Sequence, residues 1–599
     1  MTRPYLYLFS LLLLLSGCQP ADTEETAGAE RPNIILIMTD DQGYGDLGFH
    51  GNEVIQTQNL DALARNSARF RQFYVSPVCA PTRASLLTGR FTLRTGVFDT
   101  YNGGAMMAAR ETTLAEILSA AGYRTGVFGK WHLGDSYPFR PGDQGFQESL
   151  VHLAGGVGQV GDYLNYFEYD SSYFNPTLLH NGEPTPTEGY CSDVYTDAAI
   201  EFIDQQGMEP FFLYLAFNAP HTPLQVPQDY YDRYAELDSV PGRARMLASG
   251  VREEQLPSVD VIRRLYGMIT NIDDNIGRLM EHLDASNLED NTIVVFLTDN
   301  GPQQYRYNAG LRNLKGSVYE GGIRVPGFFR WPGYLEAGRE IDGYAAHLDV
   351  PPTLLGLADV PLPDTLQLDG RDYSRQLLGE VDTMPSPTRF FQWQRGYPEP
   401  YRNIAVRRGD YKLVGHAGQL APLSELELYN LRDDPGEMNN LITKQQEIVE
   451  ELKTAFDEWL PEALRSPSVG NTHIVIGSDY ENPVLLNRND ARGSPGIWRQ
   501  DRIYGYWDVE VAEAGLYDFR LRFFEPVGSA GEALVRVGTT QRTIRNDNPE
   551  ATELTIENVP LQEGRQMVES WYVGPVRWGE GPAFTHFPMY VEVRHREVQ

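Results

Sequence analysis

The sequence is poor in cysteine and in positive charge. Three cysteines, Cys18, Cys79 and Cys191, occur among 599 residues, which limits disulfides to the pair Cys79–Cys191 if Cys18 is modified. Lysine and arginine total 50 against 82 aspartates and glutamates, a formal net charge of −32. Because neutralising phosphates requires clustered basic residues, this balance argues against a nucleic acid partner. An anionic substrate would have to be captured by a local basic pocket.

Long apolar runs are missing beyond the N-terminus. The run Tyr5–Leu15 follows Arg3, is too short to span a bilayer comfortably, and is typical of an export signal. It ends in Leu15-Ser16-Gly17-Cys18, which resembles the lipobox of bacterial lipoproteins. A plain cleavable signal peptide with an incidental cysteine is the alternative.

The lipobox resemblance implies a lipoprotein signal peptide over residues 1–17, followed by lipidation of Cys18. Residues 18–30 are acidic and predict a flexible tether. We therefore expect an exported protein of the bacterial cell envelope, attached by its N-terminal lipid to the membrane, at the outer membrane or the periplasmic face.

Four continuous apolar segments, each running into polar residues, predict buried strands of a parallel sheet. The clearest helix places apolar residues from Ile262 to Leu283 at alternating spacings of three and four. Helices alternating with such strands predict an α/β fold with a large mixed, mostly parallel sheet sandwiched by helices. The predicted strands lie within residues 31–43, 124–129, 211–217 and 292–297.

Two shorter helices and two long loops complete the predicted α/β domain, which spans residues 31–388. One helix runs from about Thr112 to a C-cap at Gly122. Residues 141–190 and 222–258 lack periodicity and predict loops over the active face. The other helix follows Thr57, and its apolar face is predicted to carry Leu60, Leu63, Ala64 and Phe70.

Two further units are predicted after this domain. Residues 389–461 contain an alternating hairpin over 403–414 and a helix from about 443 to 460, which predicts a smaller antiparallel α+β subdomain. Residues 462–599 alternate with period two between turn signals, which predicts an accessory β-sandwich. Its aromatic residues are core residues or sugar platforms, and a structural role is favoured; the tryptophans concerned are Trp498, Trp507, Trp571 and Trp578.

Carboxylates and an amide follow two of the predicted strands. Asp40 and Asp41 follow the first, and Asp299 and Asn300 follow the last. Any one of these aspartates could cap a helix or close a turn, but four hard oxygen ligands at strand exits together favour a Ca²⁺ or Mg²⁺ site.

A basic set accompanies the carboxylates. Arg83 can present two donors to a tetrahedral anion, and Lys130 and Lys315 add positive charge. His132 and His221 can exchange protons near neutral pH.

Cys79 lies where a loop is predicted to enter a helix, a position that lowers a thiol's pKa and attracts anions. The alternative without chemistry is a buried structural cysteine. A Cys79–Cys191 disulfide, which would remove any catalytic role of Cys79, also stays open.

The stretch Cys79-Ala80-Pro81-Thr82-Arg83, followed by Thr88-Gly89-Arg90, resembles the signature of the type I, formylglycine-dependent sulfatases. Five further segments are similar to motifs of that family and occur in the family's order. The resemblance covers about residues 31–460 and implies an alkaline-phosphatase-like fold. The further segments are Thr39–Asp46, Gly129–Gly134, Pro220–His221, Thr298–Gly301 and Lys315–Gly322.

The resemblance assigns roles to these positions. A maturation enzyme would oxidise Cys79 to formylglycine (3-oxoalanine), whose hydrate attacks sulfur with help from Asp299. Ca²⁺, rather than Mg²⁺, would be held by this hydrate at Cys79 with Asp40, Asp41, Asp299 and Asn300. His221, with Lys315, would protonate the departing alcohol, and His132 would act as the base that expels sulfate. Arg83 and Lys130 would hold the hydrate.

The resemblance implies a sulfatase for sulfated polysaccharides or their oligosaccharides, of the ulvan, carrageenan, fucoidan or glycosaminoglycan type. A phosphonate or phosphodiester hydrolase of the same superfamily is one alternative. A non-catalytic glycan-binding lipoprotein is the other. The sugar, the sulfate position and exo or endo action stay open.

Overall fold

The computed structural model describes residues 31–205, 207, 209–416, 425–494, 496–498, 500, 502–574 and 585–596. The predicted signal peptide, the lipidation site Cys18, the tether and Trp578 lie outside these residues. No helix in the described part of the chain is long and apolar enough to cross a membrane. The chain from Pro32 onward forms one unit.

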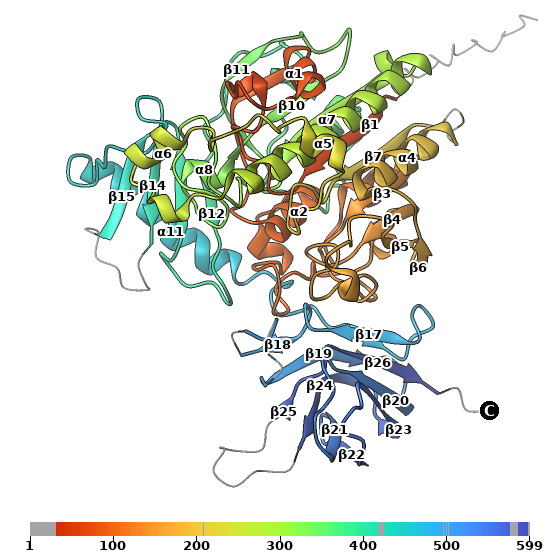
Figure 1. The fold of residues 1–599 in the computed structure, drawn as a ribbon. Coiled ribbons are helices and arrows are strands. Elements are labelled where there is room, and N and C mark those ends of the chain that lie inside the picture. Colours follow the sequence, from red (N-terminus) through yellow and green to blue (C-terminus); the bar gives the residue numbers. More distant parts are fainter. Residues whose placement is uncertain are drawn as a thin grey trace, which may run out of the picture. The chain divides into compact units, whose positions relative to one another are not determined.

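The central sheet has 11 strands in the described part of the chain (Figure 1). Its strands are β1 Asn33–Thr39, β2 Ala68–Tyr74, β3 Arg124–Lys130, β4 Glu148–His152, β5 Thr177–His180, β6 Glu183–Pro186, β7 Phe211–Ala216, β8 Thr292–Thr298, β9 Arg324–Val325, β10 Gly327–Arg330 and β11 Glu340–Ala346. Their order is β11-β2-β10-β8-β1-β7-β3-β4-β5-β6, with β9 beside β2. The run β8-β1-β7-β3-β4 is parallel, whereas β10, β5 and β6 pair antiparallel. The predicted mixed, mostly parallel sheet is confirmed.

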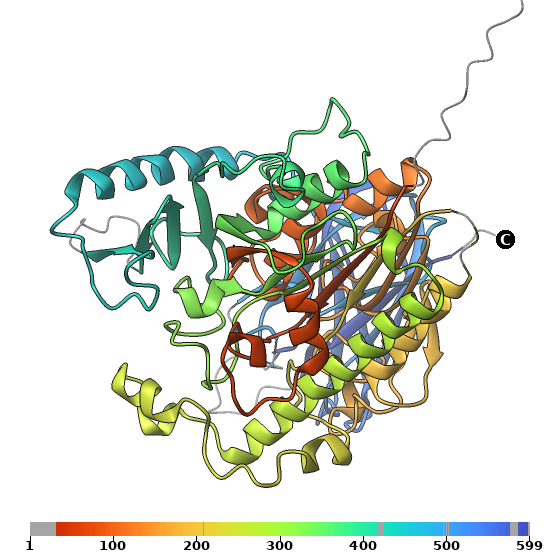
Figure 2. The same ribbon diagram turned by 90° about the horizontal axis from the view of Figure 1, so that it is seen from above.

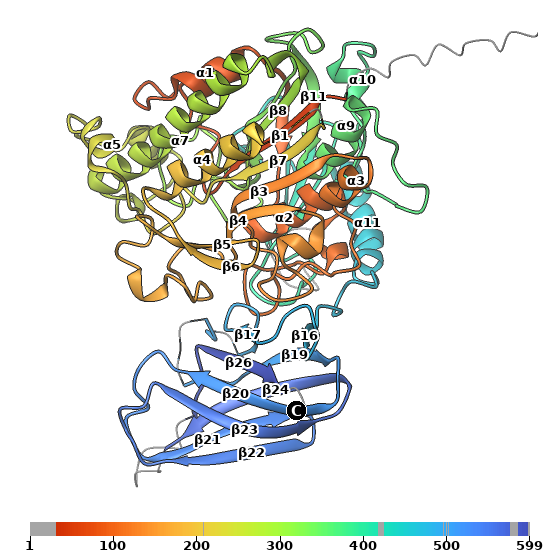
Figure 3. The same cartoon turned by 90° about the vertical axis from the view of Figure 1, so that its right-hand side faces the viewer.

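Helices cover both faces of this sheet (Figure 3). Alternate residues of β1 serve opposite cores: Ile35 and Ile37 face the core that includes α1, α4 and α7, and Leu36 faces the core that includes α2, α3 and α9. Burial on both faces explains the continuous apolar run of β1. The helices are α1 Gln58–Arg65, α2 Cys79–Thr88, α3 Leu114–Ala120, α4 Cys191–Asp204, α5 Gln228–Asp232, α6 Arg243–Ala248, α7 Val259–Ala285, α8 Glu320–Ile323, α9 Val350–Leu357 and α10 Ser374–Leu377.

The smaller antiparallel unit is a four-stranded sheet crossed by one helix. Its strands, β12 Arg389–Gln392, β13 Ile404–Arg408, β14 Tyr411–Gly415 and β15 Leu426–Asn430, pair in sequence order. The helix α11, Gln446–Ala463, runs across the strands (Figure 2) and buries Val449, Leu452 and Phe456. The predicted hairpin is the β13–β14 pair.

The C-terminal unit consists of two facing sheets, as its alternating pattern predicts. One sheet contains β16 Ile474–Ile476, β18 Arg492–Gly493, β19 Gly505–Val511, β21 Gly531–Val537, β22 Thr540–Asn546, β24 Gly564–Val573 and β25 Thr585–His586. The other contains β17 Val484–Asn487, β20 Gly515–Arg522, β23 Glu553–Leu561 and β26 Tyr590–His595. Trp507 is fully buried between them, so this tryptophan is a core residue.

Two expectations need correction, and one open alternative is removed. Phe70 lies in β2 and not on a helix, because α1 ends at Arg65 and the chain re-enters the sheet at Ala68. The stretch 141–190 contains β4, β5 and β6; these strands are short and β6 forms one edge of the sheet, so they leave little periodic signal. Cys79 and Cys191 are both free and buried, which removes the disulfide alternative.

Candidate active site

The carboxyl ends of four adjacent parallel strands bring the predicted charged residues together. Asp40 follows β1, Asp299 follows β8, Lys130 ends β3 and His221 follows β7. In a parallel sheet these ends share one edge, where ligands bind. The side chains of Asp40, Lys130 and Asp299 are fully buried, and the Lys130 ammonium pairs directly with the Asp40 carboxylate.

Cys79 is the first residue of α2, as its sequence context predicts. Val78 precedes it with extended backbone, and Cys79 itself is buried. Arg83 follows one turn later on the same helix face. Its guanidinium donates to Asp299 Oδ2 at 3.0 Å and to the carbonyl oxygen of Lys130 at 2.9 Å. The helix therefore brings Cys79 and Arg83 to the carboxylates.

Glycines allow the loop that carries Lys315 to reach the same point. Gly301 N donates to the Gly322 carbonyl at 2.9 Å, and a Cβ on Gly301 would lie only 1.9 Å from the Gly321 carbonyl oxygen. Glycine is thus required for this close approach. The backbone N–H of Gly316 donates to Pro77 O at 2.8 Å, and Lys315 Nζ lies 2.5 Å from Asp41 Oδ1.

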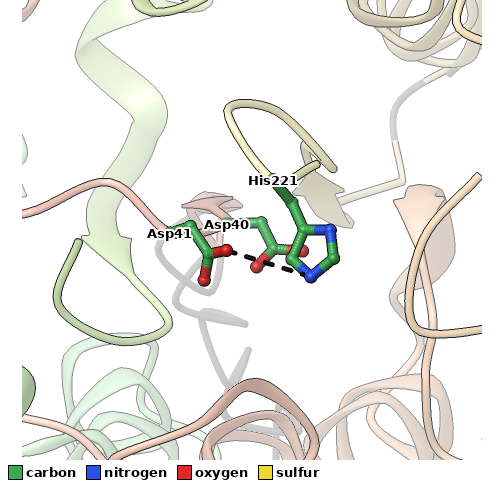
Figure 4. Close-up of side chains that lie close together, drawn as sticks. All are labelled: Asp40, Asp41 and His221. Atoms are coloured by element: carbon green, nitrogen blue, oxygen red, sulfur yellow. Dashed lines mark ion pairs between the residues drawn. The ribbon is translucent and has the colours of Figure 1, made fainter. Parts of the chain in front are cut away.

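Buried oxygen atoms without hydrogen-bond partners in the described part of the chain indicate a candidate cation site. Asp40 Oδ1, Asp41 Oδ2 and Asn300 Oδ1 are buried and accept no hydrogen bond from the described residues. Such atoms are costly unless a ligand satisfies them, so the donor set fits a hard divalent cation. Asp40, Asp41 and His221 each offer a ligand atom within 4.8 Å of the others, and the His221 imidazole faces both carboxylates (Figure 4).

The predicted metal ligands are not equivalent. Both oxygens of Asp299 already accept hydrogen bonds, from Asp41 N at 3.2 Å and from Arg83 at 3.0 Å. His221, predicted as a proton donor, also offers a ligand atom to the metal-compatible cluster. The Asn300 amide nitrogen donates to Asp41 Oδ1 at 2.8 Å, which orients its own oxygen as an acceptor.

Each histidine has one nitrogen fixed by a backbone carbonyl. His132 Nε2 donates to Thr100 O at 2.9 Å, which leaves Nδ1 unprotonated and without a partner in the described part of the chain. His221 Nδ1 donates to Thr222 O at 2.7 Å, and its Nε2 lies 3.8 Å from Asp41 Oδ2. Burial lowers the pKa of both imidazoles, that of His221 to about 4.

The site has shifted pKa values and unusual backbone angles. Burial alone would raise the pKa of Asp40, but the nearby cations, Lys130 foremost, hold it well below its usual value. Burial alone would lower the pKa of Lys315, yet Asp41 raises it. Asp41 and His132 adopt left-handed φ values of 63° and 60°, a strain that surrounding structure must maintain.

A cavity of about 1070 Å³ opens above these groups. We use the name charged floor for ten residues at the base of this cavity. Four of them line the cavity: Cys79, His132, His221 and Lys315. The other six are buried: Asp40, Asp41, Arg83, Lys130, Asp299 and Asn300. Other lining residues escaped the sequence analysis because they lie on aperiodic loops. They include Thr100, Tyr101, Tyr166, Gln303, Trp393, Arg395, Asn489 and Phe524.

Comparisons with known proteins agree with this geometry. Residues 32–360 match the family model described as "Sulfatase", and residues 314–462 match "N-sulphoglucosamine sulphohydrolase, C-terminal". Human arylsulfatase A is 34% identical over 69% of this chain and 84% of its own length. Pig N-acetylgalactosamine-6-sulfatase is 33% identical over 60% of this chain and 68% of its own length.

A solved structure shares the fold. The crystal structure titled "Ps i-CgsB in complex with k-i-k-neocarrahexaose" has a TM-score of 0.62 and 29% identity, covering 73% of this chain and 94% of that one. Both family models end by residue 462, before the C-terminal β-sandwich. The family match over more than half of the chain, the arylsulfatase relatives and the shared fold establish that the chain belongs to the sulfatase family of the alkaline phosphatase superfamily, the sulfuric ester hydrolases.

Proposed function

We propose that this sulfatase removes sulfate from sulfated polysaccharide or its oligosaccharides, using formylglycine made from Cys79 and one Ca²⁺ ion. The observation that carries the proposal is the placement of Cys79 at the start of α2. It lines one cavity with Lys315, and Arg83, Lys130 and the unpartnered carboxylate oxygens are buried in the charged floor of that cavity. The cavity is far larger than a sulfate group, which favours a saccharide.

Asp40, Asp41 and Asn300, with Asp299, would hold Ca²⁺, which would neutralise negative charge developing on the sulfate oxygens. Arg83 and Lys130 hold Asp299 and Asp40 in place, so these carboxylates stay aimed at the ion. The hydrated aldehyde at position 79 would supply the nucleophile and, unlike a serine hydroxyl, a second hydroxyl for releasing sulfate.

Proton transfer falls to groups that the backbone orients. The unprotonated Nδ1 of His132 is the base for the second hydroxyl, because the Thr100 carbonyl fixes the opposite nitrogen. His221 Nε2 and Lys315 Nζ approach the two oxygens of the Asp41 carboxylate and line the cavity, where the leaving alcohol oxygen would receive a proton.

The test is sulfate release from sulfated oligosaccharides of the ulvan, carrageenan, fucoidan and glycosaminoglycan types, by enzyme co-expressed with a formylglycine-generating enzyme. We expect release from at least one of them and none from Cys79→Ala, whose melting temperature should match the wild type. Full activity of Cys79→Ala would refute the mechanism.

The two alternatives give different results in the same test. A phosphonate or phosphodiester hydrolase would cleave bis-4-nitrophenyl phosphate faster than any sulfate ester. A non-catalytic glycan-binding protein would bind the saccharides but release nothing.

We also propose that Cys18 anchors the protein by lipid in the cell envelope, from the sequence Leu15-Ser16-Gly17-Cys18. Cys18→Ala expressed in a bacterium should move the protein from the membrane fraction to the soluble fraction. Unchanged fractionation would contradict the anchor.

A further inference from the structure

The C-terminal β-sandwich is fixed against the catalytic part by hydrogen bonds and apolar packing. Ser136 Oγ donates to the Leu485 carbonyl at 2.9 Å, and Val475 N donates to the Tyr137 carbonyl at 3.1 Å. Met106 and Phe139 of the catalytic part belong to the sandwich's own hydrophobic core. Their side chains would lose that burial if the sandwich separated, so its position relative to the cavity is set by packing.

The sandwich also supports the loop that orients His132. Gly493 N donates to Asn102 Oδ1 at 2.9 Å, and Gly103 N donates to the Asn489 carbonyl at 3.3 Å. Two residues before Asn102, the Thr100 carbonyl accepts the hydrogen bond of His132. The loop of residues 98–104 therefore lies between the sandwich and the charged floor.

Two aromatic residues of the sandwich line the cavity beside aromatic residues of the catalytic part. Trp498 lies next to Tyr101, with ring centroids 6.3 Å apart, and Phe524 lies next to Tyr166 at 5.1 Å. We call these four residues the aromatic wall; all are partly exposed. The guanidinium of Arg488 lies 4.3 Å from the Phe524 ring centroid, which holds this ring in place.

A cationic group lies in the same cavity. Arg395 lines it, and its side chain keeps 51% of its surface exposed while Nη1 donates to Asp99 Oδ1 at 2.7 Å. Its guanidinium lies 4.5 Å from the Tyr101 ring centroid, next to the aromatic wall. Aromatic faces and one cation together suit a ligand with flat apolar faces and negative charge, as in an anionic sugar.

We propose that the β-sandwich is part of the active site: Trp498 and Phe524 bind the sugar unit adjacent to the sulfated one, and Arg395 faces that unit's negative groups. This inference rests on the proposed function and gives it a specificity-determining site. Trp498 and Phe524 of this site lie outside the part of the chain that the family models match. It also assigns Trp498 to the substrate, which reverses the structural role favoured from the sequence for this tryptophan.

The test compares two substrates that share a sulfate ester but differ in size. Trp498→Ala and Phe524→Ala are assayed on 4-nitrophenyl sulfate and on sulfated hexasaccharides from carrageenan and chondroitin 6-sulfate. We expect the ratio of kcat/KM for the better hexasaccharide to kcat/KM for the aryl ester to fall about 10-fold in each variant. Trp571→Ala is the matched control, because this tryptophan lies on β24 and does not line the cavity. Its ratio should not change.

The outcomes separate this inference from the proposed function. An unchanged ratio in both wall variants overturns the inference, whether or not overall activity falls, because parallel losses indicate a structural role. If the wild type releases sulfate from none of these substrates and from none of the four saccharide types tested for the proposed function, the proposed function fails. Calorimetric binding of the hexasaccharides to Cys79→Ala, with and without Trp498→Ala, then decides the inference alone. Binding weakened about 10-fold by Trp498→Ala supports it, and equal or absent binding overturns it.

Discussion

The charged floor and the aromatic wall meet in one cavity but are built differently. Floor residues such as Asp40, Lys130 and Arg83 are completely buried, lie at strand ends or on α2, and are held by one another's charges. Wall residues such as Trp498 and Tyr101 are partly exposed and lie on loops. The floor therefore has one arrangement fixed by the sheet, whereas the wall can vary without disturbing the fold. This division assigns chemistry to the floor and choice of sugar to the wall.

Removing a carboxylate from the floor should have the largest effect. We expect Asp41→Asn to lower sulfate release by about 10³-fold, because it removes a cation ligand and the partner of Lys315. Adding Ca²⁺ to chelator-treated enzyme should raise the melting temperature of the wild type and not that of the variant.

Asp273→Asn is the matched control for loss of a buried carboxylate. Asp273 accepts hydrogen bonds from Leu60 N and Asn59 N, away from the cavity, so its variant should lose stability and keep the Ca²⁺ response. If Ca²⁺ still raised the melting temperature of Asp41→Asn, the cation would not bind at the charged floor.

His132→Asn should have the next largest effect, at least about 10²-fold on kcat, because a general base is lost while the fold is preserved. The measurement is turnover of 4-nitrophenyl sulfate at neutral pH. A change in kcat below about 3-fold would show that another group takes the proton.

Removing the charge of Asp99, which contacts both the loop that orients His132 and Arg395 beside the aromatic wall, should have a moderate effect on kcat. Asp99 is buried and accepts hydrogen bonds from Gly396 N at 2.8 Å, Arg395 at 2.7 Å and Thr100 N at 2.7 Å. It is a positioning residue, since it accepts a hydrogen bond from the backbone of Thr100, whose carbonyl oxygen accepts one from His132. We expect Asp99→Asn to lower kcat about 10-fold with either substrate and to shift the pH profile of kcat. A variant that loses only stability would contradict this role.

The smallest effect is expected at the interface between the catalytic part and the β-sandwich, and it changes only the stability of the protein. Asp135 and Asp490 face each other's charge there, and burial raises the pKa of both, that of Asp490 to about 7. The folded protein then keeps protons that the unfolded chain releases above about pH 4, so stability falls as pH rises from about 4 to about 7.

Asp490→Asn removes the cost of ionising this buried carboxyl in the folded protein. It should raise the melting temperature by about 1–3 °C at pH 8 and less at pH 5. An equal change at both pH values would mean that the pair does not titrate in this range.

The floor was predictable from the sequence because its signals are local. Asp40 and Lys130 each follow or end an apolar run, and strand ends meet in any parallel sheet. One departure has a physical reason: Phe70 belongs to a strand that begins three residues after the preceding helix ends. The position of His221 beside the two carboxylates could not be predicted, because it follows from a loop whose course no periodicity encodes.

The wall was not predictable. Trp498 and Tyr101 are separated by nearly 400 residues, and the alternating pattern of a sandwich does not say which of its loops will dock on another unit. Trp507, by contrast, follows the period-two pattern of its strand, and the pattern placed it in the core.

The central claim is that an aldehyde made from Cys79, and not its thiol, performs the chemistry of the charged floor. The direct measurement is the fraction of position 79 converted to formylglycine, by peptide mass spectrometry, across preparations made with and without a co-expressed formylglycine-generating enzyme. Each fraction is compared with the sulfate-release activity of the same preparation. We predict proportionality that passes through zero. Undiminished activity in a preparation whose Cys79 is entirely thiol would contradict the account.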